Sequence, residues 1–311
     1  MDLKQLEYFV RVAELGSFTR ASIALDVAQP ALSRQIRLLE VELRQSLLTR
    51  NGRGATPTEA GKLLLEHGRG ILHQVAVARE ELGASRGSLA GRVSIGLPPS
   101  LSRLITVPLT QAFRQHLPQA QLTLTEGFSL LMYDGLRLGN LDLAVLYNPD
   151  RSPELEMSTL HEEELVLISA RSGTPAGTRA AASRARQRAP VTLEDVAALP
   201  LILPSRPNAF RILIERELMR IGRKPRIALE VDGLNAILSL VKEGYGHAVL
   251  PTYTLSNFDN ADPFTVRRIH SPPIMSQLML VRSSRRPITQ TQRTALGLIQ
   301  SVVQQAIKPY V

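Results

Sequence analysis

The segment AQPALSRQIR holds the side chains with the clearest capacity for specific chemistry. Gln29 can pair with adenine through two hydrogen bonds, Arg34 can do the same with guanine, and Ser33 adapts to several bases. Pro30 stiffens the start of a helix and offers an apolar surface to a thymine methyl group. Arg37 follows one turn later, where it can reach a phosphate. The segment therefore predicts a helix that reads DNA in the major groove, the alternative being the solvated face of a structural bundle.

Three short helices are predicted to carry this surface. In the helix that holds it, apolar residues recur at spacings of three and four on the opposite face: Leu32, Ile36, Leu39 and Leu43. A first helix has an apolar face of its own: Leu3, Leu6, Phe9, Val10 and Ala13. It ends at Gly16 and Ser17. The second helix is expected to bury Ala21, Ile23 and Leu25. Three helices with a short break before the third are typical of the helix-turn-helix arrangement.

A small wing is predicted after the third helix. Asn51-Gly52 is a tight-turn dipeptide, so SLLTRNGRGATPT favours a short β-hairpin. Arg50 and Arg53 flank the turn, where they suit contacts with the DNA backbone or with a narrow minor groove. Thr58 then stands where it can cap a long helix.

The long helix, which continues to about residue 82 or beyond, predicts self-association. Its apolar residues step by four and three, the heptad spacing that lets two helices pair: Leu64, Gly68, Ile71, Val75, Ala78 and Leu82. We assign the dimer contact to four of them: Leu64, Ile71, Val75 and Leu82. The alternative is that the helix folds back within a monomer.

Beyond a hinge of small residues at 83–91, the pattern changes to short β-rich runs separated by helical segments. The runs are RVSIGL, QLTLTE, LDLAVLY, ELVLIS, LPLILPS, RIALEV and GHAVLP, with helices expected at 101–115, 208–221 and 233–243. Alternating strands and helices predict a mainly parallel sheet, as one α/β unit or two small lobes. Residues 172–190, rich in Arg, Ala, Gly and Pro, are expected to form an exposed basic loop.

Composition excludes several classes of site. The chain has 311 residues and no cysteine, so disulfides, thiolate nucleophiles and cysteine-ligated metals are excluded. Its apolar runs are too short for a membrane helix and its charged N-terminus lacks a secretory signal, so we expect a soluble, cytoplasmic protein without a membrane partner. The six histidines lack metal-binding spacing, and neither a metal nor a cofactor is expected.

Charge alone does not single out the DNA-binding segment. The net charge of +9 favours a polyanionic partner, but the first 90 residues hold only 12 basic against 10 acidic residues. Glu162, Glu163 and Glu164 are expected to form a solvated turn rather than paired catalytic carboxylates. The GYG run leads into a strand instead of opening a helix, which is against a dinucleotide-binding loop.

The motifs also carry a family resemblance. LKQLEYFVRVAELGSFTRAS, AQPALSRQIRLLEVEL and, after LLTR, RGATPTEAG stand in the order and spacing of LysR-type transcriptional regulators, and GRVSIG, GNLDLAV and GYGHAVLP continue the likeness. Leu47 and Leu48 look most like the nitrogen-assimilation-control branch. The resemblance implies a DNA-binding transcriptional regulator without enzymatic activity, a homotetramer of two dimers, with RNA polymerase as a candidate partner. Paired recognition helices read half-sites about 34 Å apart or multiples of this, so an imperfect inverted repeat in double-stranded DNA is expected.

The resemblance further implies the architecture. An α/β effector domain of two Rossmann-like lobes, similar to periplasmic binding proteins, follows an all-α winged helix-turn-helix domain and a long linker helix. We divide the chain into the DNA-binding domain, 1–57, the linker helix and hinge, 58–90, and the effector domain, 91–311. A small-molecule effector is expected between the lobes, outside the carboxyl ends of the strands. Those ends predict the lining residues: Pro99, Ser100, Leu101, Ser102, Phe128, Ser129, Tyr147, Pro204, Ser205, Asp232 and His247.

Four positions depart from the usual family pattern. Ala28 stands where a serine usually caps the recognition helix, and Arg44 and Leu48 replace glycine and phenylalanine. Tyr147 stands where members that sense aromatic acids often have arginine, which is against a carboxylate clamp at that point. An effector-independent regulator of the same family stays open. So does a different class, a cytoplasmic small-molecule-binding protein or enzyme with an accessory helical domain.

Overall fold

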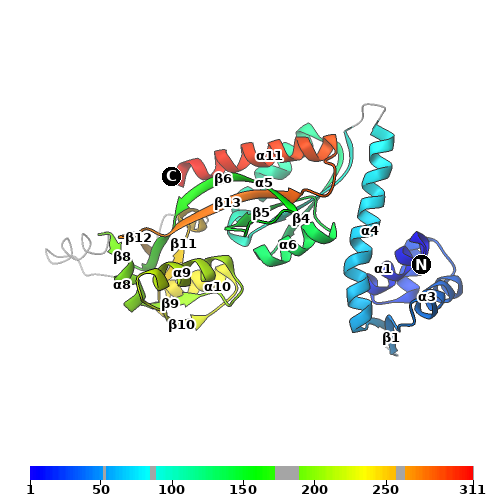
Figure 1. Cartoon of the computed structure of the whole chain (residues 1–311), viewed down its shortest axis with the longest axis horizontal. Helices are drawn as coiled ribbons and strands as arrows, with labels where there is room; N and C mark the ends of the chain where they lie inside the picture. The colour runs from blue at the N-terminus through cyan, green and yellow to red at the C-terminus, as the bar shows by residue number, and fades with distance from the viewer. Residues whose placement is uncertain (52–53, 85–88, 172–188, 257–262, 311) are drawn as a thin grey trace.

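The computed structural model describes residues 1–51, 54–84, 89–171, 189–256 and 263–310. Figure 1 shows three parts along the chain: a small domain with the N-terminus, the long helix α4, and a larger α/β domain of two lobes. Most of the predicted basic loop, 172–188, lies outside the described residues. Within the described ranges, no helix combines the length and apolar character that crossing a membrane requires.

Three helices form the N-terminal domain: α1, Leu3–Leu15, α2, Phe18–Leu25, and α3, Gln29–Leu43. Local hydrogen bonds set their ends. Asp2 caps α1 by accepting from the Gln5 amide at 2.7 Å, Gly16 ends it at a φ of 63°, and Ser17 caps α2. Most of the fully buried core comes from α1 and α3: Leu6, Phe9, Val12, Leu32, Ile36 and Leu39.

The prediction that Ile23 is buried is wrong, since its side chain is 76% exposed. α2 has only eight residues, and Ala21 and Ser22 fill its inner face. The next side chain is turned by about 100° and points outward. Leu3, which was predicted to belong to the apolar face of the first helix, lies in the first turn of α1 and is 44% exposed.

The predicted wing is present as an antiparallel hairpin of β1, Leu48–Asn51, and β2, Gly54–Pro57. The Ala55 amide donates to the carbonyl of Gly16 at 2.9 Å. The hairpin is thereby fastened to the end of α1.

α4 runs from Glu59 to Ala84, 26 residues or about 39 Å. Thr58 caps it as predicted, because its hydroxyl accepts from the Gly61 amide at 3.0 Å. Leu64 is half-buried against the core of the N-terminal domain, so part of the predicted dimer stripe is used within the chain.

The rest of that stripe lies further along α4. Val75 is half-buried, Ile71 is 39% exposed and Leu82 is 81% exposed. Pairing of two chains through these residues stays a prediction.

Lobe I of the α/β domain is built on a five-stranded sheet in the order β4-β3-β5-β13-β6. Its elements are β3, Ala90–Leu97, α5, Pro99–His116, β4, Gln119–Glu126, α6, Ser129–Leu138, β5, Leu143–Tyr147, β6, Leu155–Glu164, β13, Met275–Ser283, and α11, Gln290–Ile307, which ends in a short turn, η2, Lys308–Tyr310. Side chains alternate between the faces of β5. Leu143, Val145 and Tyr147 join the core shared with α5 and α11, whereas Ala144 and Leu146 join the core under α6.

Lobe II holds a four-stranded sheet, β11-β7-β12-β8, and a parallel pair, β10-β9. Its elements are β7, Val166–Ala170, β8, Val191–Thr192, α8, Leu193–Ala198, β9, Pro200–Leu203, α9, Ala209–Arg220, β10, Arg226–Glu230, α10, Leu234–Lys242, β11, Ala248–Leu250, η1, Thr252–Leu255, and β12, Phe264–His270. A parallel bridge between Leu201 and His247 joins the pair to the larger sheet. The chain crosses between the lobes twice, from β6 to β7 and from β12 to β13.

The sheets are mixed, which corrects the expectation of a mainly parallel sheet. β13 runs antiparallel to β5 and β6, and β7 runs antiparallel to β11 and β12. The predicted β-rich runs did not include the two-residue strand β8. They also missed β6, β12 and β13, because these crossing strands do not belong to a strand–helix–strand repeat.

Glu162, Glu163 and Glu164 do not form the solvated turn that was expected. They end β6 in regular pairing with β13. Strand alternation turns Glu163 inward, where it is 8% exposed, and leaves Glu162 exposed. Glu164 pairs with Arg268 at 2.7 Å.

Candidate DNA-binding surface and ligand cleft

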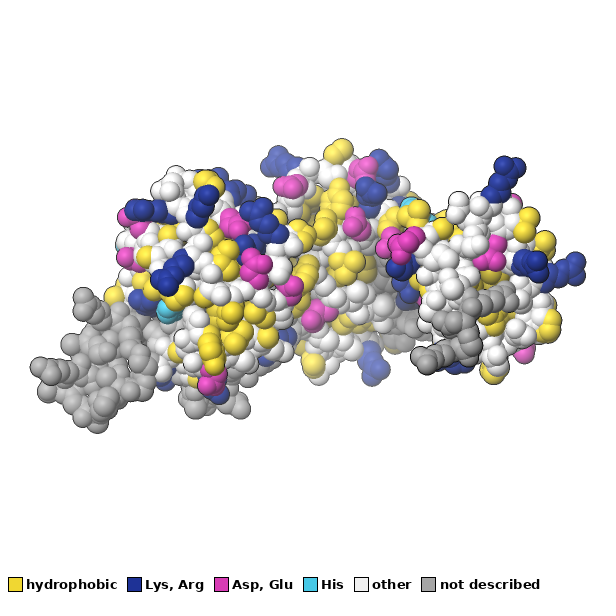
Figure 2. All heavy atoms as spheres, turned by 90° about the horizontal axis from the view of Figure 1, so that it is seen from below, with side chains coloured by type: hydrophobic (Ala, Val, Ile, Leu, Met, Phe, Trp, Pro, Cys, Tyr) yellow, Lys and Arg dark blue, Asp and Glu magenta, His cyan; other side chains and the backbone are white. Residues whose placement is uncertain are grey.

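The residues predicted to read bases share the outer face of α3. Gln29, Pro30, Arg34 and Arg37 are exposed, and Ser33 is half-buried. The inner face of α3 is locked in the core, so the outer stripe is held in one position. Figure 2 shows basic side chains projecting from this end of the molecule. Donors near the start of a single exposed helix fit a major groove about 12 Å wide.

The ends of α3 bear out the departures noted in the sequence. Ala28 makes no side-chain hydrogen bond to the helix, and Pro30 lies in the first turn. Arg44 ends the helix at a φ of 53°, a left-handed conformation that favours glycine. In the wing, Arg50 belongs to β1, and Arg53 lies outside the described residues.

A cleft lies between the two lobes, with about 510 Å³ of empty space that includes open solvent. Seven of the eleven predicted residues line it: Pro99, Ser100, Phe128, Ser129, Tyr147, Pro204 and Asp232. Seven other lining residues were not among the eleven: Pro98, Asn208, Ala209, Phe210, Leu234, Ile237 and Leu250. Most of the missed residues begin α9 and α10, the helices that follow β9 and β10. The first turn after each strand was therefore the signal that could have found them.

Three of the remaining predictions face elsewhere. Leu101 is fully buried in the core of lobe I. Ser102 is hydrogen bonded to Thr106, one turn further along α5, at 3.1 Å. Ser205 supports the cleft indirectly, since its amide donates to Asp232 Oδ1 at 2.8 Å.

His247 is also absent from the cleft lining. It lies at the amino end of β11, whereas Leu250, at the carboxyl end, lines the cleft. The His247 Nδ1 atom lies 2.7 Å from Ser169 Oγ, and burial lowers the pKa of the imidazole. The error was one of strand direction: the residue before a strand cannot reach the edge where ligands bind.

The floor of the cleft is a chain of hydroxyl groups that ends at a buried acid. Ser100 Oγ lies 2.8 Å from the hydroxyl of Tyr147, which is hydrogen bonded to the hydroxyl of Tyr253. Tyr253 in turn donates to Glu163 Oε1 at 3.2 Å. Burial raises the pKa of Glu163 to about 8, and burial likewise raises the pKa of both tyrosines. The carboxyl group and the two phenols are therefore predominantly neutral at pH 7.

Besides the hydrogen bond between Tyr147 of lobe I and Tyr253 of lobe II, two further contacts join the lobes across the cleft. The ring of Tyr147, from β5, lies 4.4 Å from the ring of Phe210, from α9, at an interplanar angle of 47°. Arg103 of α5 donates a hydrogen bond to Asn235 of α10. The distance between the lobes therefore depends on these side-chain contacts.

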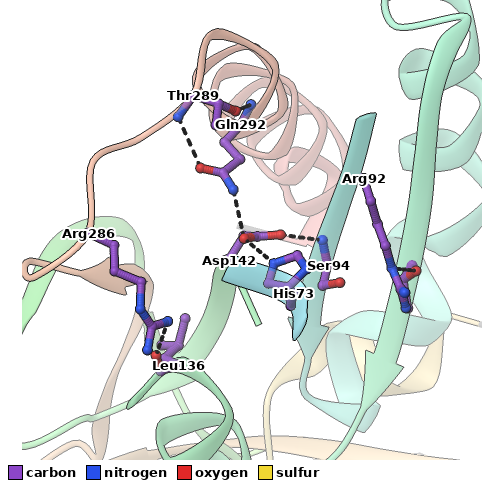
Figure 3. Close-up of polar contacts among 9 residues, drawn as sticks. His73, Arg92, Ser94, Leu136, Asp142, Arg286, Thr289 and Gln292 are labelled. Atoms are coloured by element: carbon purple, nitrogen blue, oxygen red, sulfur yellow. Dashed lines mark hydrogen bonds and ion pairs between the residues drawn. The ribbon is translucent and has the colours of Figure 1, made fainter. Parts of the chain in front are cut away.

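Lobe I is also attached to α4, at the end of the lobe away from the cleft. Figure 3 shows Asp142, just before β5, at the centre of this attachment. Its Oδ1 atom lies 2.7 Å from His73 Nε2 and accepts from Gln292 Nε2 at 2.7 Å, and Oδ2 accepts from the Ser94 amide at 2.7 Å. The side chains of Asp142 and His73 are 4% and 9% exposed. A buried carboxyl group with these donors holds α4, β3 and α11 together.

Among the described residues, no group of three or more His, Asp or Glu side chains is arranged to hold a metal ion.

Comparisons with known proteins match both halves of the chain. Residues 3–62 match the family model of bacterial regulatory helix-turn-helix proteins of the lysR family, and residues 86–304 match the LysR substrate binding domain. The nitrogen assimilation regulatory protein nac of Klebsiella aerogenes is 33% identical over 304 residues, which cover 97% of this chain and 95% of the relative. Its namesake in Escherichia coli K12 is 31% identical over the same shares.

Solved structures share the fold. A full-length OxyR variant from Pseudomonas aeruginosa has a TM-score of 0.70 at 22% identity, covering 98% of each chain. CbnR in complex with its target DNA has a TM-score of 0.68 at 24% identity, covering 98% of this chain and 100% of that one. The chain belongs to the LysR family of bacterial regulatory helix-turn-helix proteins, and it is a DNA-binding transcriptional regulator with an effector-binding domain.

Proposed function

We propose that this regulator acts in the cytoplasm, without enzymatic activity, by reading an imperfect inverted repeat with the outer face of α3. Gln29, Ser33 and Arg34 read base edges, and Pro30 contacts a thymine methyl group. Arg37, with Arg50 and Arg53 of the wing, contacts the DNA backbone. The observation that carries this proposal is that the donors of α3 share one outward face of a helix whose other face is fixed in the core. The half-sites are read by paired chains in a homotetramer, with RNA polymerase as a candidate partner.

Substitution of Arg34 tests the base-reading assignment. Loss of a bidentate contact to guanine is expected to weaken binding by about 1–3 kcal/mol and to relax specificity at one base position. Gel shifts of Arg34→Ala on DNA from upstream of its own gene, at one fixed salt concentration, measure both effects. Arg79→Ala, an exposed arginine on α4, is the matched control and should bind like the parent. Parent binding no tighter than binding to random duplex would overturn the assignment.

For the cleft, we propose a small uncharged ligand with an apolar body and one hydrogen-bonding end. Among the residues that the structure describes, no Lys, Arg or His lines the cleft, so a carboxylate would find no cationic side chain from them there. Asp232, at the exposed rim, disfavours anions further. The floor offers the hydroxyls of Ser100 and Tyr147, which can either donate or accept.

A thermal-shift screen of the full chain tests this ligand class. Each neutral compound is paired with its carboxylic acid and its amine. A neutral ligand at 100 times its dissociation constant should stabilise the effector domain by about 2.7 kcal/mol, and Tyr147→Phe should reduce the shift. Stabilisation by the acids instead would contradict the proposed class. A flat screen would favour the effector-independent regulator.

Chemical conversion of a hit compound by the protein would favour the rival class, a small-molecule enzyme with an accessory helical domain. The non-enzyme assignment is supported by the position of the buried acid, Glu163, which is hydrogen bonded to Tyr253 and is not among the residues that line the cleft. Incubation of the hit compounds with the full chain, followed by mass spectrometry, distinguishes binding from conversion.

A further inference from the structure

The floor of the cleft is the first part of a buried hydroxyl chain, which consists of Ser100, Tyr147, Tyr253 and Glu163 in that order. Ser100 and Tyr147 line the cleft, whereas Tyr253 and Glu163 are absent from its lining. Each of the four residues is at most 8% exposed. Among the described residues, none of the three hydroxyl groups has a hydrogen-bond partner outside the chain. The hydrogens of these hydroxyls are therefore shared only within the chain or with a ligand.

Three hydroxyl hydrogens serve three hydrogen bonds in this chain when Glu163 is ionised. A carboxylate only accepts, so Tyr253 donates to Glu163 and in turn accepts from Tyr147. Ser100 must then donate to Tyr147, because an open link would leave a buried polar group unpaired. All three hydrogens are committed, and Ser100 offers only the lone pairs of its oxygen to the cleft. A ligand at this floor must then bring a donor.

A proton on Glu163 adds a fourth hydrogen and removes this constraint. The protonated acid can donate to Tyr253, so that each hydroxyl turns round and Ser100 directs its hydrogen into the cleft. The floor can then donate to a carbonyl oxygen or a ring nitrogen. The original direction stays open as well, because a protonated carboxyl group still has an oxygen that accepts. A ligand that donates is therefore accommodated in both protonation states.

The surroundings of Glu163 favour the protonated acid. Among the described residues, the titratable groups that face it are the phenols of Tyr253, from η1, and Tyr147, from β5, and β13 places Ser276 opposite it. The other charged groups of β6 interact elsewhere: His161 with Glu162, Glu162 with Gln277, and Glu164 with Arg268. Burial therefore dominates and raises the pKa of Glu163 to about 8.

We propose that Glu163 is a specificity-determining residue that does not touch the ligand: its proton sets the direction of the hydroxyl chain, and with it whether Ser100 can donate a hydrogen bond into the cleft. The inference rests on the proposed function, because it assigns the polar end of the neutral ligand proposed for this cleft. A ligand whose polar end only accepts is bound together with the proton on Glu163. A ligand whose polar end donates needs no such proton.

The coupling along the chain can be measured without a ligand. Ordinary Asp and Glu side chains are ionised above pH 6, so an infrared band of a protonated carboxyl group that is absent from Glu163→Gln reports Glu163 alone. Its disappearance between pH 6 and 10 gives the midpoint of titration. Ser100→Ala removes the donor at the far end of the chain and should raise this midpoint, because the ionised acid is then supported by an incomplete chain. Tyr253→Phe removes the donor to the carboxylate itself and should raise the midpoint further, by about one pH unit.

Thr110→Val is the matched control for Ser100→Ala. The Thr110 hydroxyl lies on the same helix, α5, but donates to the carbonyl of Thr106 at 2.7 Å and takes no part in the hydroxyl chain. The midpoint of this variant should equal that of the parent. The coupling would be overturned by an equal midpoint in Ser100→Ala and Thr110→Val, or by a carboxyl band that is already absent from the parent at pH 6.

Two bicyclic aromatic probes of similar size test the polarity of the floor. Indole carries an N–H donor and no strong acceptor, whereas the ring nitrogen of quinoline only accepts, and both are uncharged at pH 7 and 9. Calorimetric titration of the full chain should give a quinoline affinity about tenfold weaker at pH 9 than at pH 7, because binding retains one proton. The affinity for indole should stay within about twofold.

Substitution of the acid should remove this pH dependence. Glu163→Gln can donate or accept at either pH, so its affinity for quinoline should be the same at pH 7 and 9. Glu162→Gln, at the exposed neighbouring position, should behave like the parent. Equal pH dependence of the two probes, or an equal loss of quinoline affinity in the parent and Glu163→Gln, would overturn the assignment. Failure of both probes to bind would instead count against the neutral-ligand cleft of the proposed function, while the infrared titration still decides the coupling.

Discussion

The recognition helix and the ligand cleft are assembled in opposite ways. The DNA-reading stripe comes from nine consecutive residues on one helix, Gln29 to Arg37, whose outward direction follows from helical spacing alone. The cleft is lined by residues between Pro98 and Leu250 that come from both lobes and meet only when the whole domain has folded. The DNA-reading stripe should therefore tolerate substitution of its exposed residues without loss of the fold. The cleft, in contrast, depends on every contact that positions the two lobes.

The largest expected effect separates the two faces of α3. Ile36→Ala leaves a cavity in a fully buried core and should destabilise the N-terminal domain by about 2–5 kcal/mol. Arg34→Ala, on the exposed face, should change stability by less than about 0.5 kcal/mol while weakening operator binding. Urea unfolding and gel shifts on both variants measure the difference. A strong loss of stability in Arg34→Ala would show that the outer stripe is not independent of the core.

Glu163→Gln tests the cleft floor through pH. The folded-state pKa of about 8 lies above the ordinary value of 4.5, so between these values only the folded protein keeps the proton. The contribution of Glu163 to the free energy of unfolding is therefore complete below pH 4.5. It declines as the pH rises toward 8, by up to about 1.4 kcal/mol per pH unit. Unfolding of the effector domain at pH 5, 6, 7 and 8 should show this decline in the parent and a flatter profile in Glu163→Gln. Equal slopes in the two proteins would contradict the assignment of a buried neutral acid.

The contrast between the two regions also explains what the sequence could predict. Caps, turns and amphipathic spacing are local, so Thr58, the wing and the buried face of α3 were predicted correctly. Ile23 was not, because two residues of α2 already fill the space beneath that helix. The dimer stripe was predicted from its spacing alone, which could not reveal that Leu64 is partly buried against the N-terminal domain of its own chain.

In the cleft, lining residues could be predicted only where the end of each strand was assigned correctly, because the residues that follow the carboxyl end lie at the cleft. Tyr147 and Pro204 follow the rule, whereas His247 was assigned to the wrong end of β11. Phe210 was missed because it enters from the helix of the opposite lobe, through a contact with no signature in the spacing of either segment. The hydroxyl chain to Glu163 was missed for the same reason, since its members are separated by many residues and meet only at the junction of the lobes.

The smallest effect concerns the end of the recognition helix. Arg44 adopts a left-handed conformation that disfavours a side chain with a β-carbon. Arg44→Gly removes that strain and loses some stability through the greater freedom of the unfolded chain, so a net gain of up to about 1 kcal/mol is expected. Gln45→Gly, the matched control next to it, should be neutral or destabilising, because Gln45 is not among the residues with positive φ. Thermal unfolding of the N-terminal domain measures both variants, and a loss of stability in Arg44→Gly would show that the arginine side chain contributes more than its backbone strain costs. Operator affinity should be unchanged in either variant, since neither residue belongs to the base-reading stripe, and this separates the stability of the helix from its function.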